Sequence, residues 1–418
     1  MKFTANREEL LSAAQDALSV APDKSPLKEL ECAYLAIEDG KLTVAGGNLQ
    51  VALERRIPVQ IEEEGVVIID AQMLVDMLRR LADERVAISV DANRHMDVTC
   101  GEAYYGVSTL DSAKYPRLDI PFPEDTVPVT GIPNLTRRTV FAVSETNDKP
   151  ALKCVHLIFS DEGLRAISSD GYRVATAKGD TKSTASVDML IPADSLGRLA
   201  RLVSNKDELR VGMTGNTVVF MKEDFIFSAR LVQGSYFDEK QMLSRVQAAF
   251  MVLTDAQALR SAMTSAYAVT GEQNRFSLTF QGARLRMSCE SEYGASAQEI
   301  DVVPLSGNPS GIYWYNPEKL FECLKALSGT MMLKVASNGA LLMETDELIC
   351  LQGPMREPKP VERIAFKPRA EKKPKKSTEV EKPKKTARKT AAKGGTLKST
   401  AKPKGAKKKE SASVPEAA

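Results

Sequence analysis

Six segments with helical periodicity recur along this 418-residue chain at nearly constant spacing. A fixed period is typical of repeat architectures, in which each unit buries its apolar face against its neighbours. The other interpretation is a coincidence among ordinary α+β domains, and five similar steps argue against it. The period therefore predicts a fold built from equivalent units. The segments begin near Arg7, Ala71, Leu135, Ala193, Asp255 and Pro317, at steps of 64, 64, 58, 62 and 62 residues.

Between these segments the apolar pattern changes to period two, which indicates strands. After the first, third and fifth helices, a strand pair flanks a glycine turn, which is a good hairpin signal. These turn glycines are Gly40, Gly163 and Gly282. After the other three helices, a further strand set ends in an apolar strand. These closing strands lie at 104–110, 225–232 and 348–352.

The larger unit therefore contains two helices and two strand sets, and it occurs three times. We expect an α+β protein of roughly 24 strands and six helices, in which antiparallel sheet dominates. The expected organisation is three topologically similar domains, each with two helices packed on antiparallel sheets, followed by a tail. The boundaries are 1–122, 128–244, 245–360 and, for the tail, 367–418.

The charge is divided sharply along the chain. Residues 367–418 contain 18 Lys and Arg and 5 Glu, a net charge of +13. The remaining residues contain 39 basic and 50 acidic side chains, a net charge of −11. An acidic body joined to a basic tail predicts two physically different parts. Because the tail lacks aromatic residues and is rich in Lys, Pro, Ala, Thr and Ser, we expect it to be disordered.

The residues of common catalytic and metal sites are missing. No phosphate-binding loop, dinucleotide glycine motif, nucleophile elbow or His-Glu-x-x-His pair occurs. Cys154 and His156 would share one strand face, but zinc normally needs three or four protein ligands. The only other histidine is His95. We therefore expect no catalytic residue, no metal and no cofactor.

The six cysteines and the hydropathy pattern indicate the compartment. None of the cysteines forms a Cys-x-x-Cys pair and all lie in apolar runs, so we expect reduced, buried thiols. The N-terminus leads directly into a charged amphipathic helix, which differs from a signal peptide. No apolar run approaches the roughly 20 residues that span a bilayer. These features favour a cytosolic protein.

Several short motifs occur in the order and spacing of one known family. From residue 1 to about 356, the chain resembles the bacterial sliding clamp, the β subunit of DNA polymerase III. The Asp-Gly-x-Arg stretch and the Phe-Ala-Val-Ser run are the most specific motifs. The matching stretches are residues 1–4, Arg7-Glu8-x-Leu10-Leu11, Asp39-Gly40-x-Leu42-x-Val44-x-Gly46, Ser108-Thr109-Leu110, Phe141-Ala142-Val143-Ser144, residues 169–175, residues 224–228 and Pro354-Met355-Arg356.

This resemblance implies the DNA clamp fold: three similar domains in each subunit and a head-to-tail homodimer ring. Helices would line the hole and sheets would form the outside. The ring would encircle double-stranded DNA without sequence specificity and tether the replicative polymerase as a processivity factor. Head-to-tail contacts that close give rings. The six-helix count, made independently of the resemblance, agrees with this architecture.

A ring holds DNA by topology, so a modest set of cations on the inner helices suffices for sequence-independent, salt-sensitive attraction. Each of these cations could instead belong to an ordinary solvated helix face. Lys24 matches a position that reaches DNA in the family. The full predicted set is Lys24, Arg79, Arg80, Arg137, Arg138, Arg198, Arg201, Arg260, Lys319 and Lys325.

The resemblance also implies a hydrophobic cleft between the second and third domains that binds short peptide motifs of the polymerase and the clamp loader. Apolar walls would take the Leu and Phe anchors of a peptide. For Val174 and Leu351, core packing is the equal alternative. Departures from the family pattern at Tyr172, Val174, Ser244 and Gly353 favour a different partner specificity. The predicted cleft residues are Leu152, Ser169, Gly171, Tyr172, Arg173, Val174, Leu351, Gly353, Pro354, Met355 and Arg356.

For ring closure, alignment with the family places Met77, Tyr105 and Val107 against Ala268 and Val269 of the other subunit. Intradomain core packing is the alternative for such apolar residues.

The family usually ends near the Pro-Met-Arg segment, whereas this chain continues with the basic tail. Its Lys-Pro-Lys runs suggest nonspecific DNA binding that supplements the ring, and an inert solubilising extension is the alternative. Two other functions stay open: a clamp paralogue that scaffolds repair or transcription factors, and a protein whose DNA binding resides in the tail alone. If the protein is a sliding clamp, we expect a cytoplasmic, nucleoid-associated location.

Overall fold

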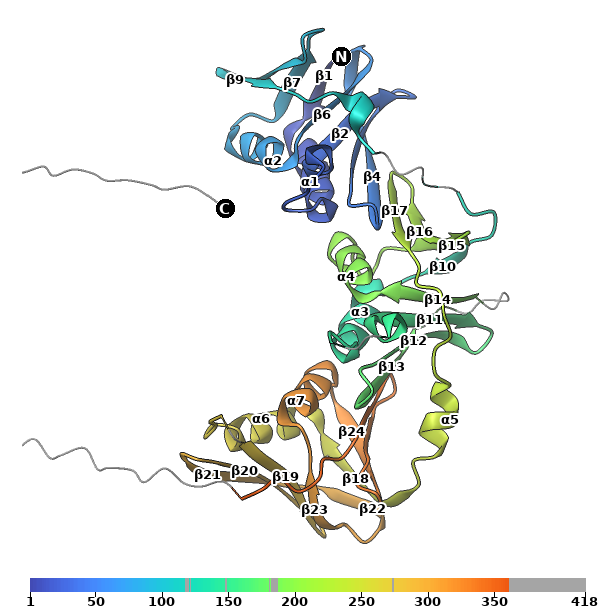
Figure 1. Ribbon diagram of the computed structural model, residues 1–418, viewed down its shortest axis with the longest axis vertical. Coiled ribbons are helices and arrows are strands. Elements are labelled where there is room, and N and C mark those ends of the chain that lie inside the picture. The colour runs from blue at the N-terminus through green and yellow to red at the C-terminus, as the bar shows by residue number, and fades with distance from the viewer. Residues whose placement is uncertain are drawn as a thin grey trace, which may run out of the picture. The chain divides into compact units, whose positions relative to one another are not determined.

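The structure is a computed structural model that describes residues 1–116, 120, 122–146, 149–179, 181, 187–272 and 274–360. Within this part of the chain there are seven α-helices and 26 strands in four sheets (Figure 1). The predicted α+β class and the dominance of antiparallel sheet are confirmed. The predicted basic tail, residues 367–418, lies outside the described residues.

Six helices correspond to the predicted series, and a seventh, α5, lies between the second and third strand groups. The six are α1 (Arg7–Val20), α2 (Ala71–Arg80), α3 (Ile132–Thr139), α4 (Ala193–Leu202), α6 (Ala256–Ala266) and α7 (Pro317–Ala326). The additional helix α5 spans Glu239–Ser244. Four single turns of 3-10 helix are η1 (Lys28–Glu31), η2 (Ser112–Lys114), η3 (Val140–Ala142) and η4 (Pro150–Lys153).

Side chains cap the starts of α1, α2, α6 and α7. Asn6, Asp70, Asp255 and Asn316 each accept a hydrogen bond from a backbone N–H in the first turn, which satisfies donors that the helix leaves unpaired.

The predicted start of α3 at Leu135 is wrong by three residues. The helix begins at Ile132, after Gly131 in a left-handed conformation with φ of 72°, and Pro133 lies in its first turn. In α4 the N-cap residue is Pro192, so Asp194 lies inside the first turn and does not cap the helix. The negative charge of Asp194 in the first turn still interacts favourably with the positive end of the helix dipole.

Two sheets are each shared by two repeats. In sheet order, the first contains β10 (Val127–Val129), β15 (Leu209–Thr214), β16 (Thr217–Lys222), β17 (Phe225–Arg230), β4 (Val51–Pro58), β3 (Lys41–Gly47), β2 (Cys32–Glu38) and β6 (Gly65–Asp70). The second contains β14 (Val187–Pro192), β11 (Cys154–Ser160), β12 (Gly163–Ser169), β13 (Arg173–Gly179), β26 (Leu348–Gln352), β25 (Leu341–Glu344), β24 (Thr330–Ala336), β18 (Ala248–Asp255) and β22 (Val303–Gly307).

The other two sheets belong to one repeat each. The five-stranded sheet contains β5 (Gln60–Glu63), β1 (Lys2–Asn6), β7 (Arg85–Val90), β8 (His95–Cys100) and β9 (Ala103–Ser108). The four-stranded sheet contains β21 (Gly294–Asp301), β20 (Arg284–Ser291), β19 (Asn274–Gln281) and β23 (Ser310–Trp314). The first repeat thus comprises β1 to β9, the second β10 to β17 and the third β18 to β26.

The repeats meet by pairing equivalent strands. At the first junction β4 pairs antiparallel with β17, and Leu53 lies opposite Phe227. At the second junction β13 pairs antiparallel with β26, and Val174 lies opposite Leu351. Backbone hydrogen bonds therefore run across both junctions, and neither junction leaves its strand edges unpaired.

The helices form a continuous row. Within the repeats α1 packs on α2, α3 on α4 and α6 on α7. Between the first two repeats, Arg198 Nη1 of α4 donates to the carbonyl oxygen of Ser19 at 2.7 Å. Between the last two, Arg173 Nη1 donates to the carbonyl oxygen of Lys319 at 3.1 Å, and η3 contacts α7.

In the nine-stranded sheet the two faces have different partners. Ala175 and Ala177 of β13 face the large core under the helices, whereas Val174 faces a separate apolar cluster on the opposite side. The helix α5 packs on that opposite side, as Figure 1 shows.

All six cysteines are free and buried, which confirms the expectation for the thiols. Burial raises the pKa of Cys32 and of Cys154 to about 11, so both stay neutral thiols near pH 7. Within the described residues, no helix is both long enough and apolar enough to cross a membrane.

A close contact between α1 and β3 depends on Gly46. A β-carbon at Gly46 would lie 2.5 Å from the carbonyl oxygen of Ala17, whereas one at Gly197, within α4, would meet nothing within 4 Å. We predict that Gly46→Ala lowers the free energy of unfolding by about 1–3 kcal/mol through overpacking. The matched change Gly197→Ala raises it by about 1 kcal/mol through helix propensity. Urea unfolding midpoints check this pair, and equal midpoints would contradict it.

Candidate nucleic-acid and partner interfaces

The cations predicted to face DNA fall into two groups in the structure. One group is exposed and lies on α2, α3, α4, α7 or the loop after α1: Lys24, Arg79, Arg80, Arg137, Arg201 and Lys325. The aliphatic stem of Lys325 places its Nζ 4.6 Å from the centre of the Phe321 ring. Arg79 lies 3.9 Å from Asp76, a distance at which an exposed ion pair contributes little. These six side chains can reach a ligand along the helix row.

The other four cations are engaged in contacts that connect elements. Arg198 pairs with Asp194 at 2.9 Å and also bonds Ser19, as described above. Arg138 pairs with Glu347, and Lys319 pairs with Asp170. Arg260 Nη1 donates to the carbonyl oxygen of Leu324 at 3.4 Å. Their charge contributes to the local potential, but their side chains already have partners.

The predicted cleft residues converge at the second junction, although almost 180 residues separate the two groups in the chain. The end of β12, the following turn and the start of β13 carry Ser169 to Val174, and the segment after β26 carries Gly353 to Arg356. The two segments meet because β13 pairs with β26, and the Gly353 N–H donates to the carbonyl oxygen of Tyr172 at 2.8 Å. Leu152, in η4, is half-buried.

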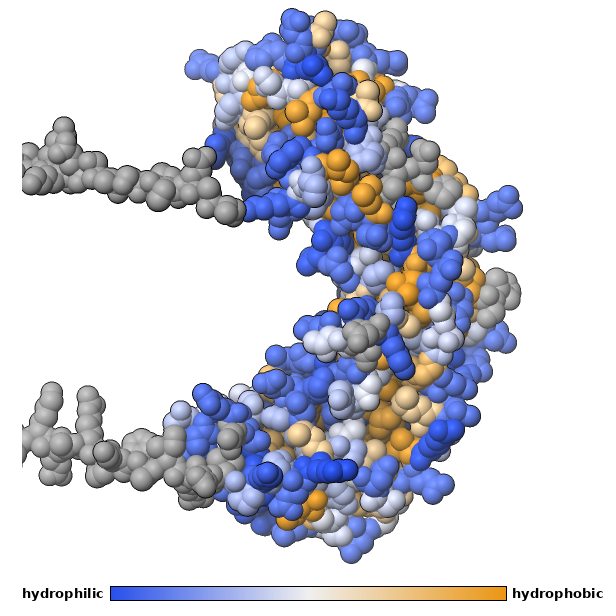
Figure 2. Space-filling model, in the orientation of Figure 1, coloured by the Kyte–Doolittle hydropathy of each residue, from blue (hydrophilic) through white to orange (hydrophobic). Residues whose placement is uncertain are grey.

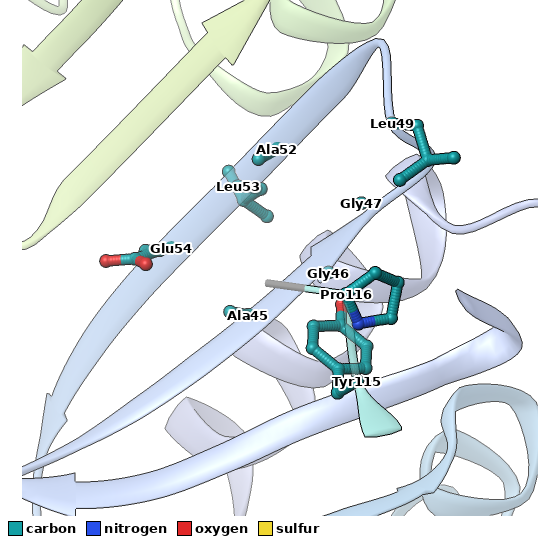
Figure 3. Close-up of a pocket in the computed structure, with 9 residues that line it drawn as sticks. All are labelled: Ala45, Gly46, Gly47, Leu49, Ala52, Leu53, Glu54, Tyr115 and Pro116. Atoms are coloured by element: carbon teal, nitrogen blue, oxygen red, sulfur yellow. The ribbon is translucent and has the colours of Figure 1, made fainter. Parts of the chain in front are cut away.

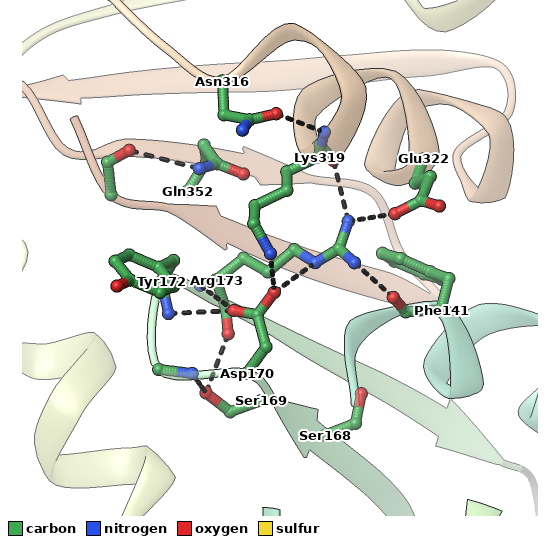
Figure 4. A network of polar contacts seen from close by, with 12 residues as sticks. Phe141, Ser168, Ser169, Asp170, Tyr172, Arg173, Asn316, Lys319, Glu322 and Gln352 are labelled. Carbon is green, nitrogen blue, oxygen red and sulfur yellow. Dashed lines mark hydrogen bonds and ion pairs between the residues drawn. The ribbon is translucent and has the colours of Figure 1, made fainter. Parts of the chain in front are cut away.

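A buried polar network holds this turn (Figure 4). Asp170 Oδ1 accepts hydrogen bonds from the backbone N–H groups of Tyr172 at 2.9 Å and Arg173 at 3.0 Å. Asp170 Oδ2 lies 3.2 Å from Arg173 Nε and also pairs with Lys319 Nζ. A single carboxylate thus fixes the turn and binds two cations, which is a charge-assisted arrangement.

Arg173 also connects the second repeat to α7. Its Nη1 lies 2.6 Å from Glu322 Oε2, and its Nη2 donates to the carbonyl oxygen of Phe141. The Arg173 side chain is only 5% exposed, and its bonds hold the turn and η3 of the second repeat against α7. Sequence reasoning placed Arg173 in the cleft by resemblance, and the structure gives it this joining role as well.

The apolar part of the predicted cleft is covered. Val174 and Leu351 are only 4% and 9% exposed and cluster with Ile167 and Leu342. Tyr172 and Met355, by contrast, are 72% and 46% exposed. The cover comes from the connection between β17 and β18, whose half-buried side chains pack on the cluster: Tyr236, Phe237, Met242, Leu243 and Val246.

Sequence reasoning missed this cover. The sequence signal that could have revealed the cover is the aromatic pair Tyr236-Phe237. This pair follows the second repeat, just as Tyr115-Pro116 follows the first.

At the first junction the corresponding surface is filled. Tyr115 and Pro116 lie against Gly46, Gly47 and Leu53 (Figure 3) and leave a cavity of about 10 Å³. A cavity of that size is at the lower limit for holding one water molecule. The Tyr115 ring also packs on Tyr34, with ring centres 5.3 Å apart. Among the described residues, Tyr115 and Pro116 therefore occupy the position at the first junction that would correspond to a peptide groove.

Two strands in positions equivalent to the paired junction strands have a free edge within the described part of the single chain. They are β9 and β21, the outer strands of the five-stranded and four-stranded sheets. Of the residues predicted for the dimer interface, Tyr105 and Val107 are half-buried on β9, Ala268 is exposed and Val269 is half-buried after α6. Met77 is 6% exposed and belongs to the core of the first repeat.

The remaining polar groups and the exposed face characterise the rest of the molecule. Among the described residues, no group of three or more His, Cys, Asp and Glu side chains could hold a metal ion. His156 is buried and pairs with Asp188. The face in Figure 2 is mostly hydrophilic, with small hydrophobic groups among the hydrophilic residues. Three repeats joined through continuous sheets, with a row of helices carrying exposed cations, define a clamp-type protein.

Family comparisons agree with this class. The DNA polymerase III beta subunit N-terminal domain matches residues 1–119, and the central domain of the same subunit matches residues 126–238. The beta sliding clamp of Bacillus subtilis is 25% identical over 359 residues, which cover 82% of this chain and 94% of that protein.

Solved structures show the same fold. The sliding clamp of Bacillus subtilis superposes with a TM-score of 0.79 at 23% identity, covering 85% of this chain and 99% of that one. A putative DNA polymerase III beta subunit from Eubacterium rectale gives a TM-score of 0.80 at 19% identity, with the same coverage. The chain belongs to the DNA polymerase III beta subunit family. It is a sliding clamp, an accessory processivity factor that is not itself an enzyme.

The Arg173 network makes a testable contribution to stability. Removing one partner of a buried ion pair leaves the other partner's charge uncompensated, so we predict that Arg173→Met lowers the free energy of unfolding by about 3 kcal/mol. Arg286 pairs with Glu299 at 3.5 Å on an exposed strand. The matched variant Arg286→Met therefore changes the free energy of unfolding by less than about 0.5 kcal/mol. Denaturant unfolding of both variants measures the difference. Similar losses in the two variants would show that the junction does not depend on this network.

Proposed function

We propose that two copies of this chain close head to tail into a ring around double-stranded DNA. The observation that carries the proposal is the pair of open edges on β9 and β21. Each repeat contains two strand sets. One set ends in β9 in the first repeat, in β17 in the second and in β26 in the third. The other set ends in β4, β13 and β21, in the same order of repeats. β17 with β4 and β26 with β13 form the two junctions within the chain, so β9 and β21 are the remaining equivalent pair.

Pairing β9 of one copy with β21 of the other would produce a third continuous sheet. It would have nine strands, as the second junction has. Two such contacts close a two-fold, head-to-tail ring and remove all equivalent edges. In this arrangement Tyr105 and Val107 would approach Ala268 and Val269 of the other copy, while Met77 would support β9 from the core behind it.

The row of helices would face the DNA. The exposed cations Lys24, Arg79, Arg80, Arg137, Arg201 and Lys325 would contact phosphates without reading bases, and the paired cations would add to the potential. The body's net charge of −11 would repel DNA from its other surfaces. Attraction of this kind is weak at physiological salt and compatible with sliding.

The proposed partners are the replicative polymerase and the clamp loader, through short peptide motifs that bind at the second junction. Exposed Tyr172 and Met355 flank the apolar cluster, which supports an apolar peptide anchor there.

The proposed domains are 1–122, 128–244 and 245–360. The tail, 367–418, with its net charge of +13, would add sequence-independent affinity for DNA. We place the protein in the cytoplasm, associated with the nucleoid.

Retention on DNA of different topology tests the proposal. The full-length protein and residues 1–366 are assembled on closed circular DNA, after loading or forced ring opening, and the DNA is then linearised. We predict that both forms stay on circles and leave the linear product, because only a closed ring is held by topology. Equal retention on both DNA forms, or loss of retention with the tail, would instead favour the tail as the DNA-binding element.

A further inference from the structure

The connection between the second and third repeats crosses the predicted peptide cleft. It contains α5, in which the Asp238 side chain accepts a hydrogen bond from the Gln241 N–H at 2.9 Å. The helix has only six residues. A helix of this length is marginal by itself, so its stability depends on what it packs against.

One buried ion pair holds the start of α5 on the sheet. Glu239 is 6% exposed, and its Oε2 lies 2.9 Å from Nη1 of Arg165 on β12, which is 19% exposed. The next residue, Lys240, pairs with Glu162 at 2.7 Å, but both side chains are more than half exposed. The buried pair is therefore the stronger attachment, since exposed pairs are screened by solvent.

The apolar side of α5 covers the floor of the cleft. Met242, Leu243 and the following Val246 pack on the cluster that contains Val174 and Leu351. Arg165 precedes Ile167 by two residues on β12, so both side chains project from the same face of the sheet. The ionic attachment and the apolar floor thus form one continuous surface beneath α5.

The fit of the cover is incomplete. The Nδ1 atom of His156 is buried and has no hydrogen-bond partner in the described part of the chain. His156 packs on Tyr236, with ring centres 5.0 Å apart. The Tyr236 hydroxyl is also buried without a hydrogen bond of normal geometry there. Burial raises the pKa of Tyr236, although the backbone of Ser169 lies near enough to oppose the shift. Unsatisfied buried polar groups disfavour the covered state.

We propose that α5 is a displaceable cover of the peptide cleft, and that partner peptides combine an apolar Leu or Phe anchor with a carboxylate. The anchor replaces Met242 and Leu243 on the apolar floor. The carboxylate replaces Glu239 at Arg165, because an arginine uncovered without a partner would otherwise oppose opening. This inference rests on the proposed docking function and adds the chemical class of the partner and the residue that selects it.

Peptide titrations of the full-length protein test the proposal. The probes are fluorescein-labelled Gly-Ser-Asp-Ser-Leu-Phe-Gly and the same peptide with Asn in place of Asp. Because Glu239→Gln weakens the attachment of α5, we expect it to bind the Asp peptide at least five-fold tighter than the wild type. The matched variant Lys240→Gln, which changes only the exposed pair, stays within two-fold of the wild type.

Arg165→Gln separates the two parts of the inference. It also releases α5, but it removes the partner of the peptide carboxylate. The wild type and Glu239→Gln prefer the Asp peptide to the Asn peptide, and Arg165→Gln loses that preference. Hydrogen exchange of the amides at 239–244 is faster in both variants than in the wild type, which reports opening without a peptide.

The inference is overturned if Glu239→Gln binds no tighter than the wild type, including the case in which neither binds, or if exchange at 239–244 is unchanged. These outcomes are distinct from failure of the ring. If the protein stays on circular DNA but Glu239→Gln has no effect, the clamp function is supported and only the inference of a displaceable cover is contradicted.

Discussion

The architecture of this protein depends on pairing the edges of its sheets. An edge strand exposes a row of unpaired backbone N–H and C=O groups, and a neighbouring strand satisfies them best. Each repeat has two such edges in equivalent positions, and two junctions within the chain pair β4 with β17 and β13 with β26. The same constraint applies to β9 and β21, so the geometry of the single chain already indicates how copies of it would assemble.

The second junction combines this backbone pairing with side-chain chemistry. Asp170 fixes a turn, and Arg173 extends from that turn to Glu322 of the next repeat. On one face of the sheet this network adjoins the helix row, and on the other face the β13–β26 pairing forms an apolar floor. The helix-row surface and the predicted cleft therefore lie on opposite faces of one rigid junction.

Much of the fold followed from sequence because local signals agreed with the global period. The helices α1, α2 and α7 begin at the expected residues Arg7, Ala71 and Pro317, and the glycine hairpins recur in phase. The start of α3 and the existence of α5 did not follow. Gly131 in a left-handed conformation is a less regular start signal than an Asn cap, and α5 is stabilised by tertiary contacts that its six residues do not encode. The cleft residues were predicted by resemblance, and the burial of Val174 and Leu351 could not be predicted because it depends on the β17–β18 connection, which meets them only in the folded chain.

Sedimentation equilibrium of the full-length protein tests the central claim most directly, because pairing of β9 with β21 has one closed solution for two copies. The account predicts a single species of twice the 45.6-kDa chain mass whose mass stays constant as concentration rises above the dimer range. A mass that remains that of one chain at all concentrations would show that the edges do not pair. A mass that grows continuously beyond the dimer would show that they pair without closing.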